Sequence, residues 1–163
     1  MHPERIEPQP GQESVWDYPR PPRIEPTSEH VVVSFRGTAL AESSRAIRVL
    51  ETSQPPAYYI PPGDVSFDML VEGDGHSFCE WKGQASYFDL VVPGTRIEQV
   101  AWTYTHPSVP FAAIKDYLGF YAQKLECAVD REAVVPNEGS FYGGWVTSKV
   151  VGPFKGVPGS KWW

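Results

Sequence analysis

The chain of 163 residues is long enough for one domain with its own hydrophobic core, and 41% of its residues are hydrophobic. Its formal net charge of −6 argues against binding to nucleic acid or to anionic lipid, because both depend on an excess of Lys and Arg. The 17 Pro and 14 Gly residues favour turns and short strands over long helices.

The sequence shows no membrane or export signal. No apolar stretch reaches the roughly 18 residues that would span a bilayer, and residues 1–16 lack the apolar centre of a signal peptide. We therefore expect a cytoplasmic protein without a membrane partner.

Residues 1–14 are predicted to form an extended, proline-rich arm, since seven prolines fall within residues 1–26. Trp16 and Tyr18 lie between prolines, where aromatic side chains often pin an arm to an apolar surface. Both are expected to dock on a single β-rich domain that comprises residues 15–135.

The first half of this domain is predicted to consist of short strands. Residues 30–43 alternate in polarity and break at Arg36-Gly37-Thr38, as in a hairpin. Residues 46–51 are expected to be extended, although their pattern also permits a short helix, and residues 57–60 form another strand. Residues 72–77, EGDGHS, are typical of a loop.

The second half is predicted to contain another hairpin and one helix. Residues 86–104 form the hairpin around Pro93-Gly94. Between residues 111 and 126, apolar side chains recur at helical spacing: Phe111, Ile114, Tyr117, Leu118, Tyr121 and Leu125. The expected fold class is mainly β (α+β), with compact, coiled antiparallel sheets and one prominent α-helix near 111–126.

Residues 136–163 form a glycine-rich, aromatic extension that is too apolar for a solvated linker. We expect it to pack on the domain, with part of residues 145–151 forming an edge strand.

Two cysteines, Cys79 and Cys127, are too few for a disulfide framework and lack the spacing of a zinc site, so no metal is predicted. No cofactor motif is present. Cys79 begins the stretch CEWKG, which has three interpretations. Cys79 is a nucleophile activated by Lys82, or it is a core residue beside a turn, or Lys82 presents its charge to a ligand at an aromatic cleft.

The aromatic side chains on the predicted strands favour the third interpretation. A concave apolar site with a few convergent polar groups is what a ligand pocket requires. The predicted site binds a small anionic or polar ligand through two cations that share one hollow, and its residues are Arg45, Glu51, Tyr59, Lys82, Tyr87 and Trp102.

Several sequence blocks in this order resemble a bacterial family of proteins, domain of unknown function 427. They are VWDYPRPPRIEP, ALAESSRAIRVLETSQPPAYYIPPGDV, CEWKGQASYF, AWTYTHP and IKDYLGFYAQKLE, and they span roughly residues 15 to 126. The resemblance implies a compact, mainly β domain with one prominent helix, and it implies little about activity.

Some catalogues give this family a nucleotidyltransferase-like label. Metal-dependent nucleotidyl transfer needs closely placed carboxylates, but Asp64 and Asp68 are four positions apart, and the GDG of residues 73–75 precedes no helix. Two alternatives to ligand binding stay open: an enzyme that uses Cys79 or transfer chemistry, and an interaction module that forms a homodimer.

Overall fold

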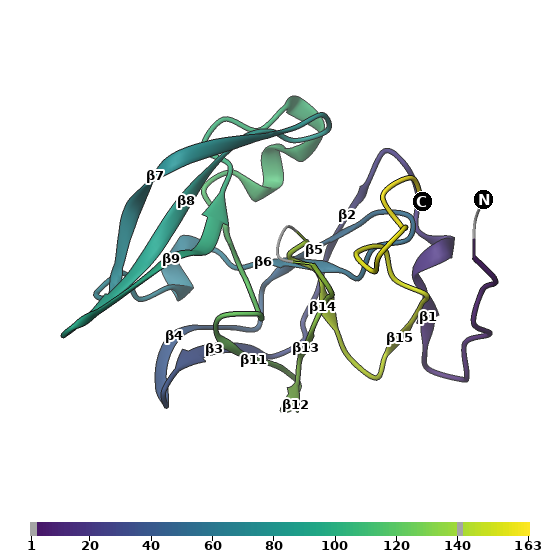
Figure 1. Ribbon diagram of the computed structural model, residues 1–163, viewed down its shortest axis with the longest axis horizontal. Helices are drawn as coiled ribbons and strands as arrows, with labels where there is room; N and C mark the ends of the chain where they lie inside the picture. The colour runs from purple at the N-terminus through teal and green to yellow at the C-terminus, as the bar shows by residue number, and fades with distance from the viewer. Residues whose placement is uncertain (1–2, 140–141) are drawn as a thin grey trace.

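The computed structural model describes residues 3–139 and 142–163, and it confirms a mainly β protein built from small sheets (Figure 1). Within the described residues there is no helix long and apolar enough to cross a membrane. The long strands β7 (Leu70–Cys79), β8 (Gly83–Val92) and β9 (Thr95–Thr103) lie at one end of the molecule, and both ends of the described chain lie at the other.

One four-stranded sheet has the order β12-β11-β3-β4. Its strands are β3 (Val31–Phe35), β4 (Thr38–Ser43), β11 (Glu126–Val129) and β12 (Glu132–Ala133). The predicted first hairpin is confirmed by the antiparallel β3–β4 pair. Its turn residues Arg36 and Gly37 both have positive φ, as a two-residue hairpin turn of type I′ requires.

The second four-stranded sheet has the order β10-β9-β8-β7. Its strands are β7 (Leu70–Cys79), β8 (Gly83–Val92), β9 (Thr95–Thr103) and β10 (Leu118–Phe120). The predicted second hairpin is confirmed by β8 and β9, which pair on either side of Pro93-Gly94.

The expected loop at residues 72–77 is wrong, because this segment lies inside β7. A Cβ atom at Gly73 would lie 2.6 Å from Oδ1 of Asp89 on the neighbouring strand. Asp89 is buried and accepts hydrogen bonds from Arg96 and from the backbone of Gln99. Gly73 therefore leaves space for the Asp89 carboxylate, and it does not mark a turn.

A three-stranded sheet contains β2 (Arg23–Pro26), β5 (Ile47–Leu50) and β6 (Ala57–Tyr59), so residues 47–50 are a strand and not a helix. Two short pairs complete the described strands: β1 (Glu13–Ser14) runs parallel to β15 (Val150–Val151), and β13 (Val135–Pro136) pairs with β14 (Trp145–Val146). The described helical turns are all of the 3-10 type: η1 (Val15–Asp17), η2 (Pro62–Asp64) and η3 (Val109–Ile114).

The prediction of a prominent α-helix over residues 111–126 is wrong. The segment forms η3, then a turn in which Asp116 has a φ of 63°, and then the strand β10. Phe111, Ile114, Leu118 and Leu125 of the predicted stripe are buried, but they reach the core from η3, from β10 and from a bend.

Tertiary packing explains why the helical period fails. In the β10–β9 pair, Gly119 lies opposite Trp102, and a Cβ atom at Gly119 would be 2.3 Å from Cζ2 of the indole. A strand with no side chain at this position lets the indole lie against the backbone, and this contact overrides a helical preference that Gly119 already weakens.

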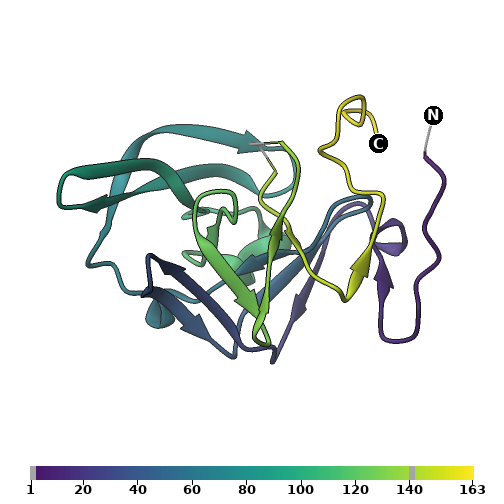
Figure 2. The same cartoon turned by 60° about the horizontal axis from the view of Figure 1, so that its bottom comes forward.

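The sheets enclose two main hydrophobic cores. The first lies between the two four-stranded sheets, which face each other as the blue β3–β4 hairpin and the teal β7–β8 strands in Figure 2. The second lies between the β7–β10 sheet and the three-stranded sheet, and it is rich in aromatic residues.

The N-terminal segment docks partly on the C-terminal segment, outside residues 15–135, because Tyr18 shares a cluster with Leu50 and Val150. Trp16 Nε1 donates a hydrogen bond to the Pro153 carbonyl oxygen at 2.8 Å, and Tyr18 is buried. Beneath them the buried Arg48 donates hydrogen bonds to the carboxylates of Glu13 and Glu25. One guanidinium thus ties β5 to β1 and β2.

We expect Gly119→Ala to lower the free energy of unfolding by about 1–3 kcal/mol, because the added methyl group overlaps the indole. In a helix the same change would raise stability by about 1 kcal/mol. Urea denaturation measures the free energy of unfolding and so distinguishes the expected loss of stability from a gain. Gly63→Ala is the control, since its Cβ would meet only the flexible end of Arg45. A stabilised Gly119→Ala variant would contradict the strand.

We expect Arg48→Met to lower the free energy of unfolding by about 3 kcal/mol, the lower end of the range for a broken buried ion pair, because its partners are partly exposed. Arg45→Met, at an exposed guanidinium, should leave stability close to that of the wild type. Burial raises the pKa of Glu13, but Arg48, Tyr18 and Arg23 together lower it by more, so this contribution is present above the unfolded pKa and is lost as pH falls through the folded pKa. Denaturant titrations from pH 7 to pH 3 measure both effects, and an acid sensitivity unchanged in Arg48→Met would contradict the assignment.

Candidate functional site

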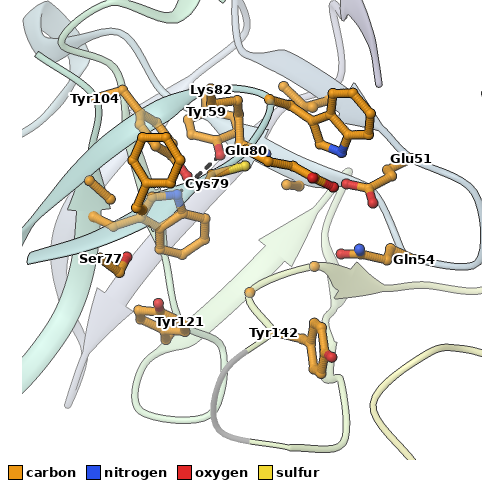
Figure 3. A pocket seen from close by; sticks show the side chains of 18 of the residues that line it. Glu51, Gln54, Tyr59, Ser77, Cys79, Glu80, Lys82, Tyr104, Tyr121 and Tyr142 are labelled. Atoms are coloured by element: carbon orange, nitrogen blue, oxygen red, sulfur yellow. Dashed lines mark hydrogen bonds between the residues drawn. The ribbon is translucent and has the colours of Figure 1, made fainter. Parts of the chain in front are cut away.

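A cavity of about 290 Å³ opens between the three-stranded sheet and the β7–β10 sheet (Figure 3). Its walls come from the end of β5, from β6, from the β7–β8 hairpin with its turn, from β9, and from residues 142–144 and 155. The aromatic residues that line it are Tyr59, Phe78, Trp81, Tyr87, Trp102, Tyr104, Tyr121 and Tyr142. The cavity volume is at the lower end of the range for ligand pockets, and the lining combines aromatic rings with polar groups.

The turn between β7 and β8, residues 80–82, is held from outside the cavity. The backbone N–H of Ser108 donates to the Lys82 carbonyl oxygen at 3.1 Å, and the Ser108 hydroxyl donates to the Trp81 carbonyl oxygen. Gly83 follows with a φ of 104°, a conformation that side-chain-bearing residues rarely adopt. This turn fixes the backbone of Lys82 at the cavity wall.

The Lys82 side chain is the most unusual group of the site, because only 9% of the residue is exposed. Its Nζ lies 5.8 Å from the centre of the Tyr104 ring and 6.0 Å from that of Phe111. Among the described residues, no carboxylate lies within ion-pair distance of this Nζ.

Lys82 is nevertheless charged. Burial lowers the pKa of this amine, but the surrounding groups, with Glu51 as the carboxylate among them, raise it by more. The pKa of Lys82 therefore lies above its usual value. The cavity wall contains a protonated amine whose contacts are mainly aromatic rings.

Hydroxyl groups line the cavity beside this ammonium. Trp102 Nε1 donates to the Tyr59 hydroxyl at 3.1 Å, and the Tyr87 and Ser77 hydroxyls are 2.6 Å apart. Burial raises the pKa of Tyr59 and that of Tyr104, so both phenols stay protonated. These hydroxyls can give and accept hydrogen bonds without adding negative charge.

Glu51 contributes a carboxylate to this wall, but that carboxylate is paired with Arg20. Its Oε2 accepts a hydrogen bond from Arg20 Nε at 3.3 Å. Lys155 also lines the cavity, and its Nζ lies 5.9 Å from the centre of the Tyr142 ring. Burial lowers the pKa of Lys155, and the nearby charge of Arg20 lowers it further.

Comparison with protein families finds a family model that matches the chain. The family model described as "Domain of unknown function (DUF427)" matches residues 23–132, which is more than half of the chain. The chain belongs to the DUF427 family. A search of curated proteins finds no significant match. The matched segment of this DUF427 protein includes Lys82 and most of the aromatic wall, whereas Tyr142 and Lys155 lie outside it.

The structure brings together most of the site residues that the sequence suggested. The cavity of the DUF427 protein is lined by Glu51, Tyr59, Lys82, Tyr87 and Trp102. Tyr58, the neighbour of Tyr59, points to the first core and stacks on Trp145, since alternate side chains of a strand face opposite sides.

Arg45 is the exception, because it does not line this cavity. Its guanidinium is exposed and forms an ion pair with Asp64 at 2.9 Å. The expectation that Arg45 and Lys82 share one hollow is therefore corrected. Ser43 also donates to Asp64, so this carboxylate is part of a surface ion pair.

Sequence reasoning missed Tyr121, Tyr142 and Lys155 as lining residues. Tyr121 was assigned to the helix that does not form, although its place among aromatic residues after a glycine is equally typical of a strand. Tyr142 and Lys155 lie in the glycine-rich extension, where no periodic pattern predicts a direction for a side chain.

Cys79 and Lys82 both line the cavity, so the turn brings together two groups that strict strand alternation would separate. Cys127 is buried in the first core, and burial raises the pKa of its thiol to about 12. Among the described residues no group of three or more His, Cys, Asp or Glu side chains could hold a metal ion.

We expect iodoacetamide at neutral pH to alkylate Cys79 at least tenfold faster than Cys127, because Cys79 is partly exposed and Cys127 is shielded and protonated. Peptide mass spectrometry of the native protein measures both rates, and Cys127→Ser is the control for unfolding. If Cys79 reacts only after denaturation, the thiol is not accessible from the cavity.

Proposed function

We propose that this DUF427 protein binds a small anionic or polar molecule in the aromatic cavity. The observation that carries the proposal is Lys82, a cation with 9% exposure and no carboxylate partner among the described residues. A buried charge that lacks a counter-ion costs several kcal/mol of stability. An anion bound in the cavity would offset that cost.

The surrounding groups fit such a ligand. Contacts with the Tyr104 and Phe111 rings compensate the ammonium only partly, by about 0.5–2 kcal/mol each. The hydroxyls of Tyr59, Tyr87 and Ser77 add neutral hydrogen-bonding groups along the wall. Rings and a single strong charge favour a ligand with an apolar, flat body and an anionic group.

Covalent chemistry at Cys79 is a second candidate, because the partly exposed thiol lines the same cavity as Lys82. The thiolate is the nucleophilic form of a cysteine side chain. The family model also has the short name NTP_transf_9, which refers to nucleotide transfer. The described residues lack the grouped carboxylates on which that chemistry depends, so we place binding first.

We expect Lys82→Met to have two effects of opposite sign. It should raise the stability of the free protein by on the order of 1 kcal/mol, because an unpaired buried charge is removed. It should also weaken benzoate binding at least tenfold. A thermal-shift titration with benzoate measures both quantities.

Lys161→Met is the matched control, since Lys161 is exposed and does not line the cavity. A structural role for Lys82 would instead give a destabilised variant. Wild-type protein that is not stabilised by benzoate or by any other small carboxylate or phosphate would overturn the proposal.

A further inference from the structure

Two lysines line the cavity, and they come from distant parts of the chain. Lys82 belongs to the β7–β8 turn, and Lys155 follows β15 in the C-terminal segment. Neither Nζ has a carboxylate within ion-pair distance among residues 3–139 and 142–163. The site therefore offers two cations to a ligand rather than one.

The two ammonium groups lie on different sides of the cavity. Lys82 lies against Tyr104, whereas Lys155 lies 5.9 Å from the centre of the Tyr142 ring. Figure 3 shows Lys82 and Tyr104 along one side, with Tyr142 away from them on the far side, beyond Gln54. Each ammonium therefore lies near a different aromatic ring of the lining.

Both lysines are held by their backbones, independently of any ligand. Ser108 binds the Lys82 carbonyl oxygen. The Lys155 N–H donates to the Ser53 carbonyl oxygen at 2.7 Å, and Asn137 Nδ2 donates to the Lys155 carbonyl oxygen at 2.8 Å. Because the main chain is fixed on both sides, both lysines project from fixed backbone positions before a ligand binds.

The wall between the cations is aromatic. Trp102 and Tyr121 have ring centres 4.6 Å apart, and Tyr59 meets the indole edge-on. This wall offers apolar ring surface to a flat ligand body, with hydroxyls only at its margins. Glu51 does not neutralise the cations, because it is paired with Arg20.

We propose that the ligand is a planar aromatic molecule with two anionic groups, one bound by Lys82 and the other by Lys155. This inference rests on the function proposed above and names the class of ligand. The aromatic body lies along the Trp102 and Tyr121 surface, and each ammonium binds one anionic group. The monoanionic analogue engages Lys82 alone.

The experiment compares benzoate with benzene-1,3- and benzene-1,4-dicarboxylate by isothermal titration calorimetry on the full chain. We expect one of the two diacids to bind at least tenfold more tightly than benzoate. Lys155→Met should remove this advantage and change benzoate affinity less than twofold. Lys82→Met should weaken both classes of ligand, and Lys161→Met should weaken neither.

The pH dependence supplies a second readout. Burial and Arg20 lower the pKa of Lys155 by more than Glu51 and Glu80 raise it, and a bound anion favours its charged form. The diacid advantage should therefore be complete below the pKa of Lys155 in the free protein and should be lost as pH rises through the higher pKa of Lys155 in the complex. Benzoate binding should persist over that interval, because the pKa of Lys82 is raised.

The outcomes separate the two proposals. If benzoate binds through Lys82, but both diacids bind no more tightly and Lys155→Met has no effect, the two-anion inference is wrong and the proposed function stands. If wild-type protein binds neither benzoate nor a diacid, both are wrong. If the diacid advantage survives in Lys155→Met, a group other than Lys155 binds the second anion, and the inference is again overturned.

Discussion

The packing of Trp102 is the constraint on which the rest of the structure depends. A Cβ atom at Gly119 would lie 2.3 Å from the indole, and so would one at Gly143. The ring therefore lies against two stretches of backbone, one in β10 and one in the C-terminal segment. Tyr59 on β6 meets the same indole at a ring-centre distance of 5.8 Å and accepts its N–H hydrogen bond. One side chain thus joins two sheets and the C-terminal segment.

This arrangement explains why a cavity persists beside an aromatic core. Tightly packed interiors leave few voids, because aliphatic side chains interdigitate. Rings that are fixed edge-on and by hydrogen bonds, such as those of Tyr59 and Trp102, cannot turn to fill the neighbouring space. The hydroxyls of Tyr87 and Ser77 bind each other and keep that wall polar. The space left between the two sheets is therefore shaped by rigid groups and not by flexible ones.

Local sequence signals predicted the parts of the fold that depend on neighbouring residues. The turns at Arg36-Gly37 and Pro93-Gly94 need only local chemistry, and both hairpins were found from it. The segment 111–126 could not be predicted in this way, because its helical spacing competes with the contact between Gly119 and Trp102. Gly119 can be read from the sequence, but nothing in the sequence identifies Trp102 as the ring that lies against it.

The same limit applies to the candidate site. The aromatic residues of the predicted strands suggested Tyr59, Tyr87 and Trp102 as site residues, and all three line the cavity. It could not predict that Arg45 pairs with Asp64 or that Lys155 reaches the cavity, because both depend on how distant segments meet. Lys82 was recognised for its charge beside a glycine, yet its burial follows from the Ser108 contacts, which no spacing reveals.

The unpaired state of Lys82 depends on a residue outside the cavity. Glu51 is the carboxylate that influences the charge of Lys82, and it would be the natural partner of a buried ammonium. Glu51 is instead paired with Arg20. Arg20 also donates hydrogen bonds to the Thr52 carbonyl oxygen and to the Ser53 hydroxyl, which hold its guanidinium in place. A buried pair of Glu51 and Lys82 would be a neutral site with little attraction for an anion. Because Arg20 satisfies the carboxylate at the rim, the positive charge inside the cavity remains available, and the N-terminal segment that carries Arg20 becomes part of the electrostatics of the site.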